Sequence, residues 1–128
     1  MEKDKKQVKK PVLAVDFDGT INSYKSGWVS PDVIPDPPTE KSKESLEILS
    51  KFFTIVIFSV RAKSELGKKG IAEYMKKYDL PYNSITDKKP NGLIIDDNCL
   101  QFKGWDNTVR AITEFEHWQK NKLQSPKK

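Results

Sequence analysis

Residues 12–20 read Val-Leu-Ala-Val-Asp-Phe-Asp-Gly-Thr, an apolar run that ends in two carboxylates two positions apart. Because the run is short, contains β-branched residues and follows Pro11, it predicts a buried strand. Two negative charges at one strand end are unfavourable unless a cation lies between them, and Gly19 allows a sharp turn behind them. The stretch therefore predicts a divalent-metal site with one carboxylate free to attack phosphorus. The alternative is that both aspartates only cap backbone amides.

The rest of the chain predicts strands that alternate with helices. Residues 22–38 contain too many proline and glycine residues for regular structure, and Thr39 is expected to be the N-cap of the first helix. Apolar runs predict strands at 53–58 and 93–95, and Ser84-Ile85-Thr86 predicts a short strand at best. Apolar residues at helical spacing within 46–53, 71–78 and 105–115 predict three helices. This alternation predicts an α/β fold, a three-layer Rossmann-like sheet that is mostly parallel and covered by helices on both faces.

The composition predicts a small water-soluble domain. The chain has 128 residues and a formal net charge of +5, with lysines gathered at both ends. We expect one domain over residues 11–122, with basic flexible tails at 1–10 and 123–128. No apolar stretch approaches the ~20 residues of a membrane span. Because Cys99 is the single cysteine, no internal disulfide can form, and we expect a cytoplasmic location without membrane contact.

Polar residues follow three of the predicted strands. Asp16 and Asp18 end the first strand, Ser59 and Arg61 follow the second, and the pair Asp96-Asp97 follows the strand at 93–95. In parallel sheets ligands bind at the carboxyl ends of the strands, near the point where the strand order reverses. These side chains are therefore expected to form one site.

Four motifs along the chain resemble those of the haloacid dehalogenase-like (HAD) phosphohydrolases. They are Asp16-Phe17-Asp18-Gly19-Thr20, Ser59-Val60-Arg61, Lys89-Pro90 and Ile95-Asp96-Asp97, and the resemblance spans residues 11–115. Within that family, the chain resembles in particular the small phage and bacterial members and the phosphatase domain of phage polynucleotide kinase-phosphatase. Because only residues 22–38 stand where relatives insert a cap domain, the resemblance implies a capless HAD-like fold.

The resemblance implies a role for each motif residue. Asp16 would be the nucleophile that forms an aspartyl-phosphate, and Asp18 the general acid and base. Lys89 would neutralise phosphoryl charge, with Lys88 as its rival. Substrate phosphate would be bound by Ser59, Arg61, Gly19 and Thr20, and Mg²⁺ by Asp16, the Asp18 carbonyl and one of Asp96 and Asp97.

Two of these residues also have structural interpretations. Arg61 suits a second phosphate or a polynucleotide backbone, but it is equally suited to a salt bridge with the aspartates. Ser59 could bind a phosphoryl oxygen or only cap a strand end. Val60 departs from the glycine found in many relatives, which puts transfer of their substrates in question.

The expected function is hydrolysis of a phosphomonoester with Mg²⁺ as the cofactor. The expected partner is a phosphorylated small molecule or a nucleic-acid end, and a homo-oligomer is left open. The alternative is a non-catalytic HAD-like binder that sequesters a phosphorylated nucleotide or signal molecule.

Overall fold

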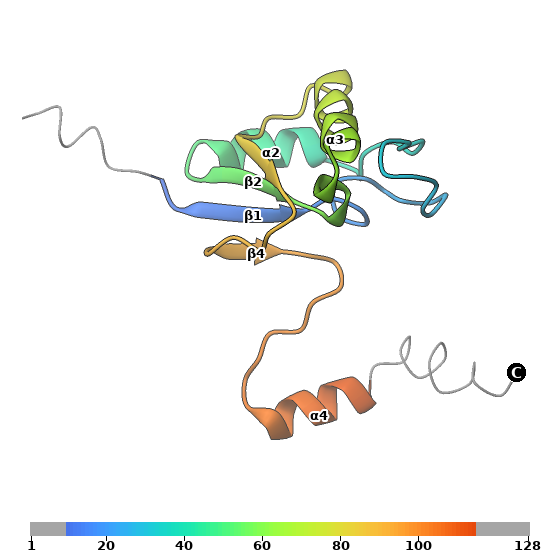
Figure 1. Cartoon of the computed structure of the whole chain (residues 1–128). Coiled ribbons are helices and arrows are strands. Elements are labelled where there is room, and N and C mark those ends of the chain that lie inside the picture. Colours follow the sequence, from blue (N-terminus) through green and yellow to red (C-terminus); the bar gives the residue numbers. More distant parts are fainter. Residues whose placement is uncertain (1–9, 115–128) are drawn as a thin grey trace, which may run out of the picture. The chain divides into compact units, whose positions relative to one another are not determined.

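The computed structural model describes residues 10–114 and has an α/β fold built on a four-stranded, all-parallel sheet (Figure 1). The elements are β1 (Val12–Asp16), α2 (Ser42–Ser50), β2 (Thr54–Phe58), the 3-10 helix η1 (Val60–Lys63), α3 (Glu65–Lys77), β3 (Ser84–Thr86), β4 (Leu93–Ile95) and α4 (Trp105–Thr113). The α/β class and the parallel sheet are confirmed.

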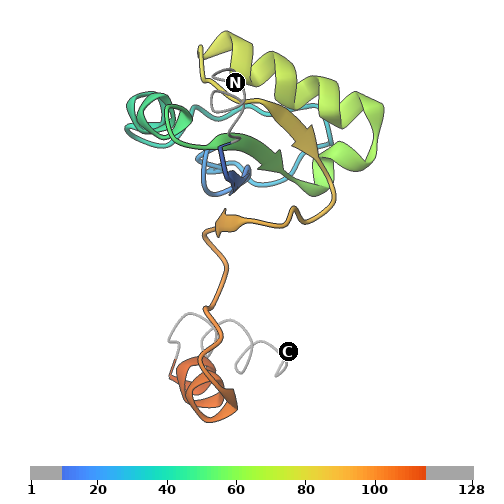
Figure 2. The same ribbon diagram turned by 90° about the vertical axis from the view of Figure 1, so that its left-hand side faces the viewer.

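The strand order is β3-β2-β1-β4, with β3 and β4 at the two edges (Figure 2). The chain moves outward from β1 to β2 and β3, and then returns to the other side of β1 to form β4. The strand order therefore reverses at the boundary between β1 and β4, which is where ligands bind in open parallel sheets. Asp16 is the last residue of β1, and the pair Asp96-Asp97 directly follows β4.

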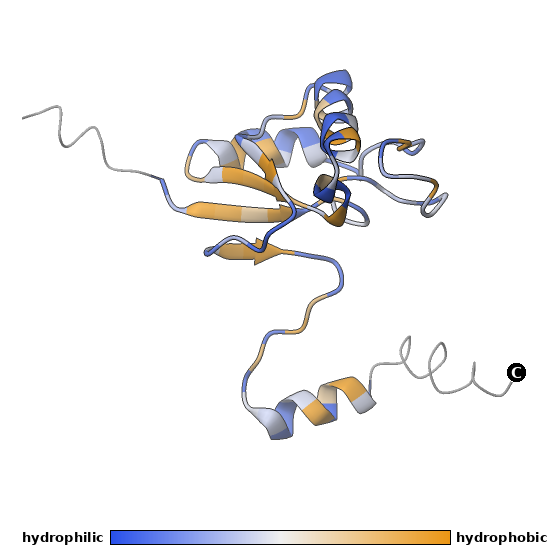
Figure 3. Cartoon of the chain, viewed as in Figure 1, coloured by the Kyte–Doolittle hydropathy of each residue, from blue (hydrophilic) through white to orange (hydrophobic). Residues whose placement is uncertain are grey.

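The core lies between one face of the sheet and the helices α2 and α3. Leu13 pairs with Ile55 and Val15 with Ile57, so these four side chains share a face, and all are buried. Figure 3 shows the apolar colouring of these strands. The helices add Leu46, Ile71, Tyr74 and Met75 to the same cluster. Burial of this cluster, at about 25 cal/mol per Å² of apolar surface, is the main force that holds the strands in register.

Both crossovers, β1-α2-β2 and β2-α3-β3, run in one direction, so right-handed connections place both helices on one face of the sheet. Residues 10–97 thus supply one helical layer. The helical layer expected on the other face of the sheet is not found within residues 10–97, so the three-layer arrangement stays a prediction.

The start of α2 differs from the prediction. The helix begins at Ser42 after Lys41, which has a φ of 67°, and Thr39 is not its N-cap. The Thr39 N–H instead donates to the Ile21 carbonyl at 2.8 Å, and its hydroxyl donates to the Thr20 carbonyl at 2.6 Å. Thr39 therefore ties this segment to the loop after β1, and the N-cap of α2 lies two residues later, at Lys41.

Contacts within the chain divide it into two compact units, residues 1–97 and 98–128. In the second unit the described part includes α4, none of whose residues is buried. Phe102 and Trp105 pack edge to face there, with ring centroids 5.2 Å apart. One domain over 11–122 stays a prediction, and the tails at 1–9 and 123–128 lie outside the described residues. No helix in the part of the chain that the structure describes is long and apolar enough to span a bilayer.

Candidate functional site

Three carboxylates meet at the carboxyl edge of the sheet, where β1 and β4 end side by side. Val15 pairs with Ile95, so the chain leaves both strands at the same level. Asp16, Asp96 and Asp97 each offer one oxygen, and these oxygens lie within 4.8 Å of one another. This acidic cluster could hold a metal ion. Because all of its ligand atoms are carboxylate oxygens, its chemistry fits a hard cation such as Mg²⁺.

The negative charges of the acidic cluster repel one another. Burial, a hydrogen bond with Asp97 and the negative charges of Asp96 and Asp97 raise the pKa of Asp16 from 3.8 to about 7. The Thr20 hydroxyl donates to Asp16 at 3.2 Å and offsets part of this rise. A bound cation or a proton reduces the repulsion between carboxylates that lie this close together.

Gly19 makes room for one member of the acidic cluster. It has a φ of +91°, and a Cβ built there would lie only 2.3 Å from Oδ2 of Asp97. Its N–H donates to the Asn22 carbonyl at 2.8 Å, and the Thr20 N–H donates to the Phe17 carbonyl at 3.2 Å. The backbone donors of the two expected phosphate ligands, Gly19 and Thr20, are thus used within the turn, and their role toward phosphate stays a prediction.

Asp18 is held apart from the acidic cluster by Arg61. The Nε atom of Arg61 donates to both carboxylate oxygens of Asp18, at 2.9 and 3.1 Å, and Asn22 Nδ2 donates to Oδ1 at 2.8 Å. The carboxylate of Asp18 is not in the group of Asp16, Asp96 and Asp97. A metal contact through its carbonyl, as expected from the resemblance, stays a prediction.

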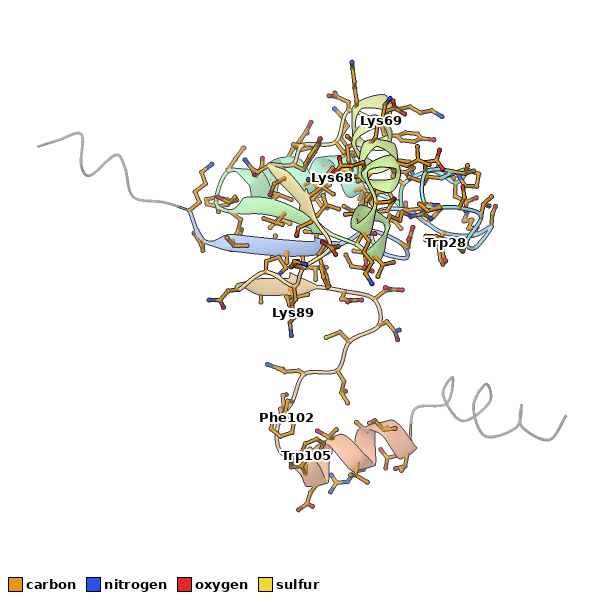
Figure 4. The ribbon with its side chains drawn as sticks, in the orientation of Figure 1. Trp28, Lys68, Lys69, Lys89, Phe102 and Trp105 are labelled. Carbon is orange, nitrogen blue, oxygen red and sulfur yellow. The ribbon has the colours of Figure 1, made fainter. Side chains whose placement is uncertain are left out.

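Arg61 is a buried junction between the site and the loop at 22–38. It is 1% exposed, and its Nη1 atom donates to the carbonyls of Ser30 and Pro31 at 2.8 and 2.9 Å. Its guanidinium carbon lies 4.5 Å from the ring centroid of Trp28, which is labelled in Figure 4. The salt-bridge interpretation of Arg61 is thus realised in the structure, and direct phosphate binding by this residue stays a prediction.

Ser59 directly follows β2 and is the N-cap of η1. Its hydroxyl oxygen accepts the Arg61 N–H at 3.1 Å, and its own N–H donates to the Thr86 carbonyl at 3.0 Å. The side chain is buried near the end of β2. Since a hydroxyl that accepts one bond still has its proton to donate, Ser59 remains able to bind a phosphoryl oxygen.

The lysine motif is the part of the site that the structure does not bring together. Lys89 lies on the exposed segment between β3 and β4 (Figure 4), and within residues 10–114 its side chain makes no hydrogen bond or ion pair. Lys88 is also exposed, and its N–H donates to the hydroxyl of Thr86 at 3.0 Å. The choice between Lys88 and Lys89 therefore stays open.

Sequence reasoning missed Asn22 and Asp36, which shape the loop after β1. Asn22 is 1% exposed, and its side chain links Asp18 to the Tyr24 N–H. The Asp36 carboxylate accepts both the N–H and the hydroxyl of Ser26 at 2.7 Å, and these bonds lower its pKa. Asparagine and aspartate commonly bond nearby backbone in loops, but this tendency does not single out these two residues.

A groove of about 630 Å³ lies elsewhere, between the C-terminal parts of α2 and α3. It is lined by Glu47, Lys76 and Tyr82 among others, and none of the three carboxylates of the acidic cluster lines it. Since α3 runs from the carboxyl edge back toward the amino edge, this groove belongs to the opposite edge of the sheet.

Comparison of the chain with known protein families, with curated proteins and with solved structures found no match. The fold and site define the protein as a small α/β domain with a four-stranded parallel sheet and an acidic cluster that could hold a metal ion.

Proposed function

We propose that the protein is a Mg²⁺-dependent phosphomonoester hydrolase of the HAD type, with Asp16 as the nucleophile. The observation that carries this proposal is the acidic cluster at the point where the strand order reverses, beside the separately held Asp18. The carboxylates of Asp16, Asp96 and Asp97 would hold Mg²⁺. When bound, the ion offsets the repulsion between these carboxylates and a phosphate dianion.

Asp16 and Asp18 divide the chemistry. A carboxylate oxygen of Asp16 bonds to phosphorus while the bond from phosphorus to the leaving oxygen breaks. Asp18 gives its proton to the leaving oxygen. It then takes a proton from the water that hydrolyses the aspartyl-phosphate, which releases inorganic phosphate and restores both residues.

Neighbouring residues support these two roles. Arg61 holds the carboxylate of Asp18 with a forked hydrogen bond, so the acid keeps one position through both steps. The hydroxyl of Ser59 is available to a phosphoryl oxygen. The hydroxyl of Thr20 donates to one oxygen of Asp16 and so helps to fix the position of the nucleophile.

A non-catalytic binder of a phosphorylated nucleotide or signal molecule is the second candidate, and the placement of Lys89 favours it. No ion pair joins this lysine to the carboxylates in residues 10–114. Within residues 10–114, Lys89 therefore does not neutralise charge at the acidic cluster, and a binder needs such a cation less than a catalyst does.

A phosphate-release screen tests the proposal and separates the two candidates. The purified protein is incubated with Mg²⁺ and nucleoside monophosphates, sugar phosphates, phenyl phosphate or oligonucleotides with a terminal phosphate. We expect catalytic release of phosphate that stops in excess chelator. Recovery of a tightly bound phosphomonoester intact by chromatography would favour the binder, and release that persists in chelator would contradict the metal-dependent mechanism.

A further inference from the structure

Trp28 lies one side chain away from Asp18. Arg61 joins them, because its Nε atom contacts Asp18 at 2.9 Å and its guanidinium carbon lies over the Trp28 ring, 4.5 Å from the centroid. Arg61 is 1% exposed, whereas Trp28 is 48% exposed. One ring face of Trp28 is thus fixed by a buried cation, and the indole still presents much of its surface to solvent.

The segment that carries Trp28 is anchored on both sides of the residue. On one side the Asp36 carboxylate binds Ser26, and on the other Arg61 Nη1 binds the carbonyls of Ser30 and Pro31. Asp36 is in turn tied to α3, because its carbonyl accepts the hydroxyl of Tyr74 at 2.9 Å. A ring held in place before a ligand arrives loses little conformational entropy on binding, which strengthens binding.

The chemistry of Asp18 places Trp28 on one side of the reacting phosphorus. A general acid must contact the leaving oxygen, so the leaving group lies on the Asp18 side of the acidic cluster. Trp28 also lies on that side, because it packs against Arg61, which contacts Asp18. We propose that the exposed surface of Trp28 stacks with the nucleobase of a nucleoside monophosphate substrate, an inference that rests on the proposed hydrolase function.

The spacing favours a nucleobase over a ring joined directly to phosphate. The guanidinium group contacts Asp18 through Nε and packs against the indole through its central carbon, so the acid and the ring are joined through this one side chain. A leaving group with a spacer between its oxygen and its ring can touch both Asp18 and Trp28, and the sugar of a nucleotide is such a spacer. Phenyl phosphate has no spacer, and glycerol 3-phosphate has no ring.

Arg61 Nη2 adds an independent indication of a ligand at this position. It is buried and is the one nitrogen of that guanidinium without a hydrogen-bond partner in the described part of the chain. Buried donors are rarely left unpaired, and each one that is calls for an explanation, such as a catalytic role or a water or ion that completes its bonding. An oxygen acceptor of a ligand bound beside Arg61 would satisfy it.

Replacement of the indole tests the proposal. Trp28→Leu keeps an apolar side chain but removes the aromatic face, and Trp28→Phe restores a smaller face. We expect Trp28→Leu to lower kcat/KM for a nucleoside monophosphate by about 5- to 100-fold, the range typical of base–aromatic stacking. The losses with phenyl phosphate and glycerol 3-phosphate should stay within about twofold, and Trp28→Phe should recover part of the nucleotide rate.

Trp105→Leu is the matched control, because Trp105 is also exposed and also contacts another side chain. We expect it to leave all three rates unchanged. An equal loss on all three substrates in Trp28→Leu would contradict the stacking role and assign Trp28 to the support of Arg61.

Calorimetry on Asp16→Asn protein separates this proposal from the hydrolase function, because it measures binding without turnover. In the presence of Mg²⁺, the double variant Asp16→Asn/Trp28→Leu should bind a nucleoside monophosphate more weakly than Asp16→Asn does. The double variant Asp16→Asn/Trp105→Leu should bind it with the same affinity as Asp16→Asn. If the wild type hydrolyses no phosphomonoester but Trp28-dependent binding is found, the hydrolase function fails and the stacking site stands. Nucleotide binding that is insensitive to Trp28 overturns the stacking site.

Discussion

The Nε atom of Arg61 lies 2.9 Å from one carboxylate oxygen of Asp18 and 3.1 Å from the other, and the arginine side chain is fully buried. Through Nη1 the same guanidinium holds the backbone of the loop at 22–38. Arg61 therefore links the proposed acid to the segment that borders it. A buried cation with these contacts is costly to remove, because its partners lose bonds that water does not fully replace.

Arg61→Ala is expected to destabilise the fold by about 3 kcal/mol, the cost typical of breaking a buried ion pair from one side. Arg61→Lys should also destabilise, since a lysine cannot reproduce the forked contact to Asp18 together with the two carbonyl contacts. Chemical denaturation measures both. Lys63→Ala, a neighbouring exposed cation on η1, is the control and should change stability by less than about 0.5 kcal/mol.

Gly19→Ala is expected to weaken Mg²⁺ binding, because its Cβ would displace the Asp97 carboxylate. Gly27 offers a matched control, since it also has a positive φ, of +75°, but a Cβ there has nothing within 4 Å. Each alanine should cost about 1 kcal/mol of stability from backbone strain. Only Gly19→Ala should change the Mg²⁺ affinity measured by calorimetry, and equal affinities in the two variants would argue against Asp97 as a ligand.

The raised pKa of Asp16 predicts a pH-dependent stability in chelator. Between pH 3.8 and about 7 the native state keeps a proton on Asp16 that the unfolded chain has lost. The native state then binds more protons than the unfolded state, so this residue makes stability fall as pH rises through that window. Between pH 5 and pH 8, the melting temperature measured by thermal unfolding should fall more in wild type than in Asp16→Asn.

Mg²⁺ should reduce that loss, because it binds the ionised acidic cluster of the native state. The same fall in melting temperature in wild type and in Asp16→Asn would place the pH response on other groups.

Strands β1, β2 and β4 could be predicted because each is an apolar run bounded by turn residues, as at Val12–Val15 and Leu93–Ile95, whereas β3 is a short stretch of mixed polarity. Parallel pairing then brings Asp16 and Asp96 together, since both follow paired strand ends. This part of the site follows from topology alone.

The surroundings of Asp18 could not be predicted in the same way. The sequence allows both a phosphate contact and a salt bridge for Arg61, because the partner of this residue depends on the path of the loop at 22–38. That path is set by long-range bonds such as Thr39 to Thr20 and Tyr74 to Asp36, which no local pattern encodes. Lys89 illustrates the converse, since a motif position in the sequence does not ensure a contact in the fold.

Phosphate release by Asp16→Asn tests the central claim most directly. The measurement compares wild type, Asp16→Asn and Asp106→Asn with phenyl phosphate and Mg²⁺, with Asp106 chosen as an exposed aspartate on α4. Loss of a nucleophile should cost several kcal/mol of transition-state stabilisation, so Asp16→Asn should fall at least about 1,000-fold while Asp106→Asn matches wild type. Turnover by folded Asp16→Asn within about tenfold of wild type would contradict the assignment of Asp16 as the nucleophile.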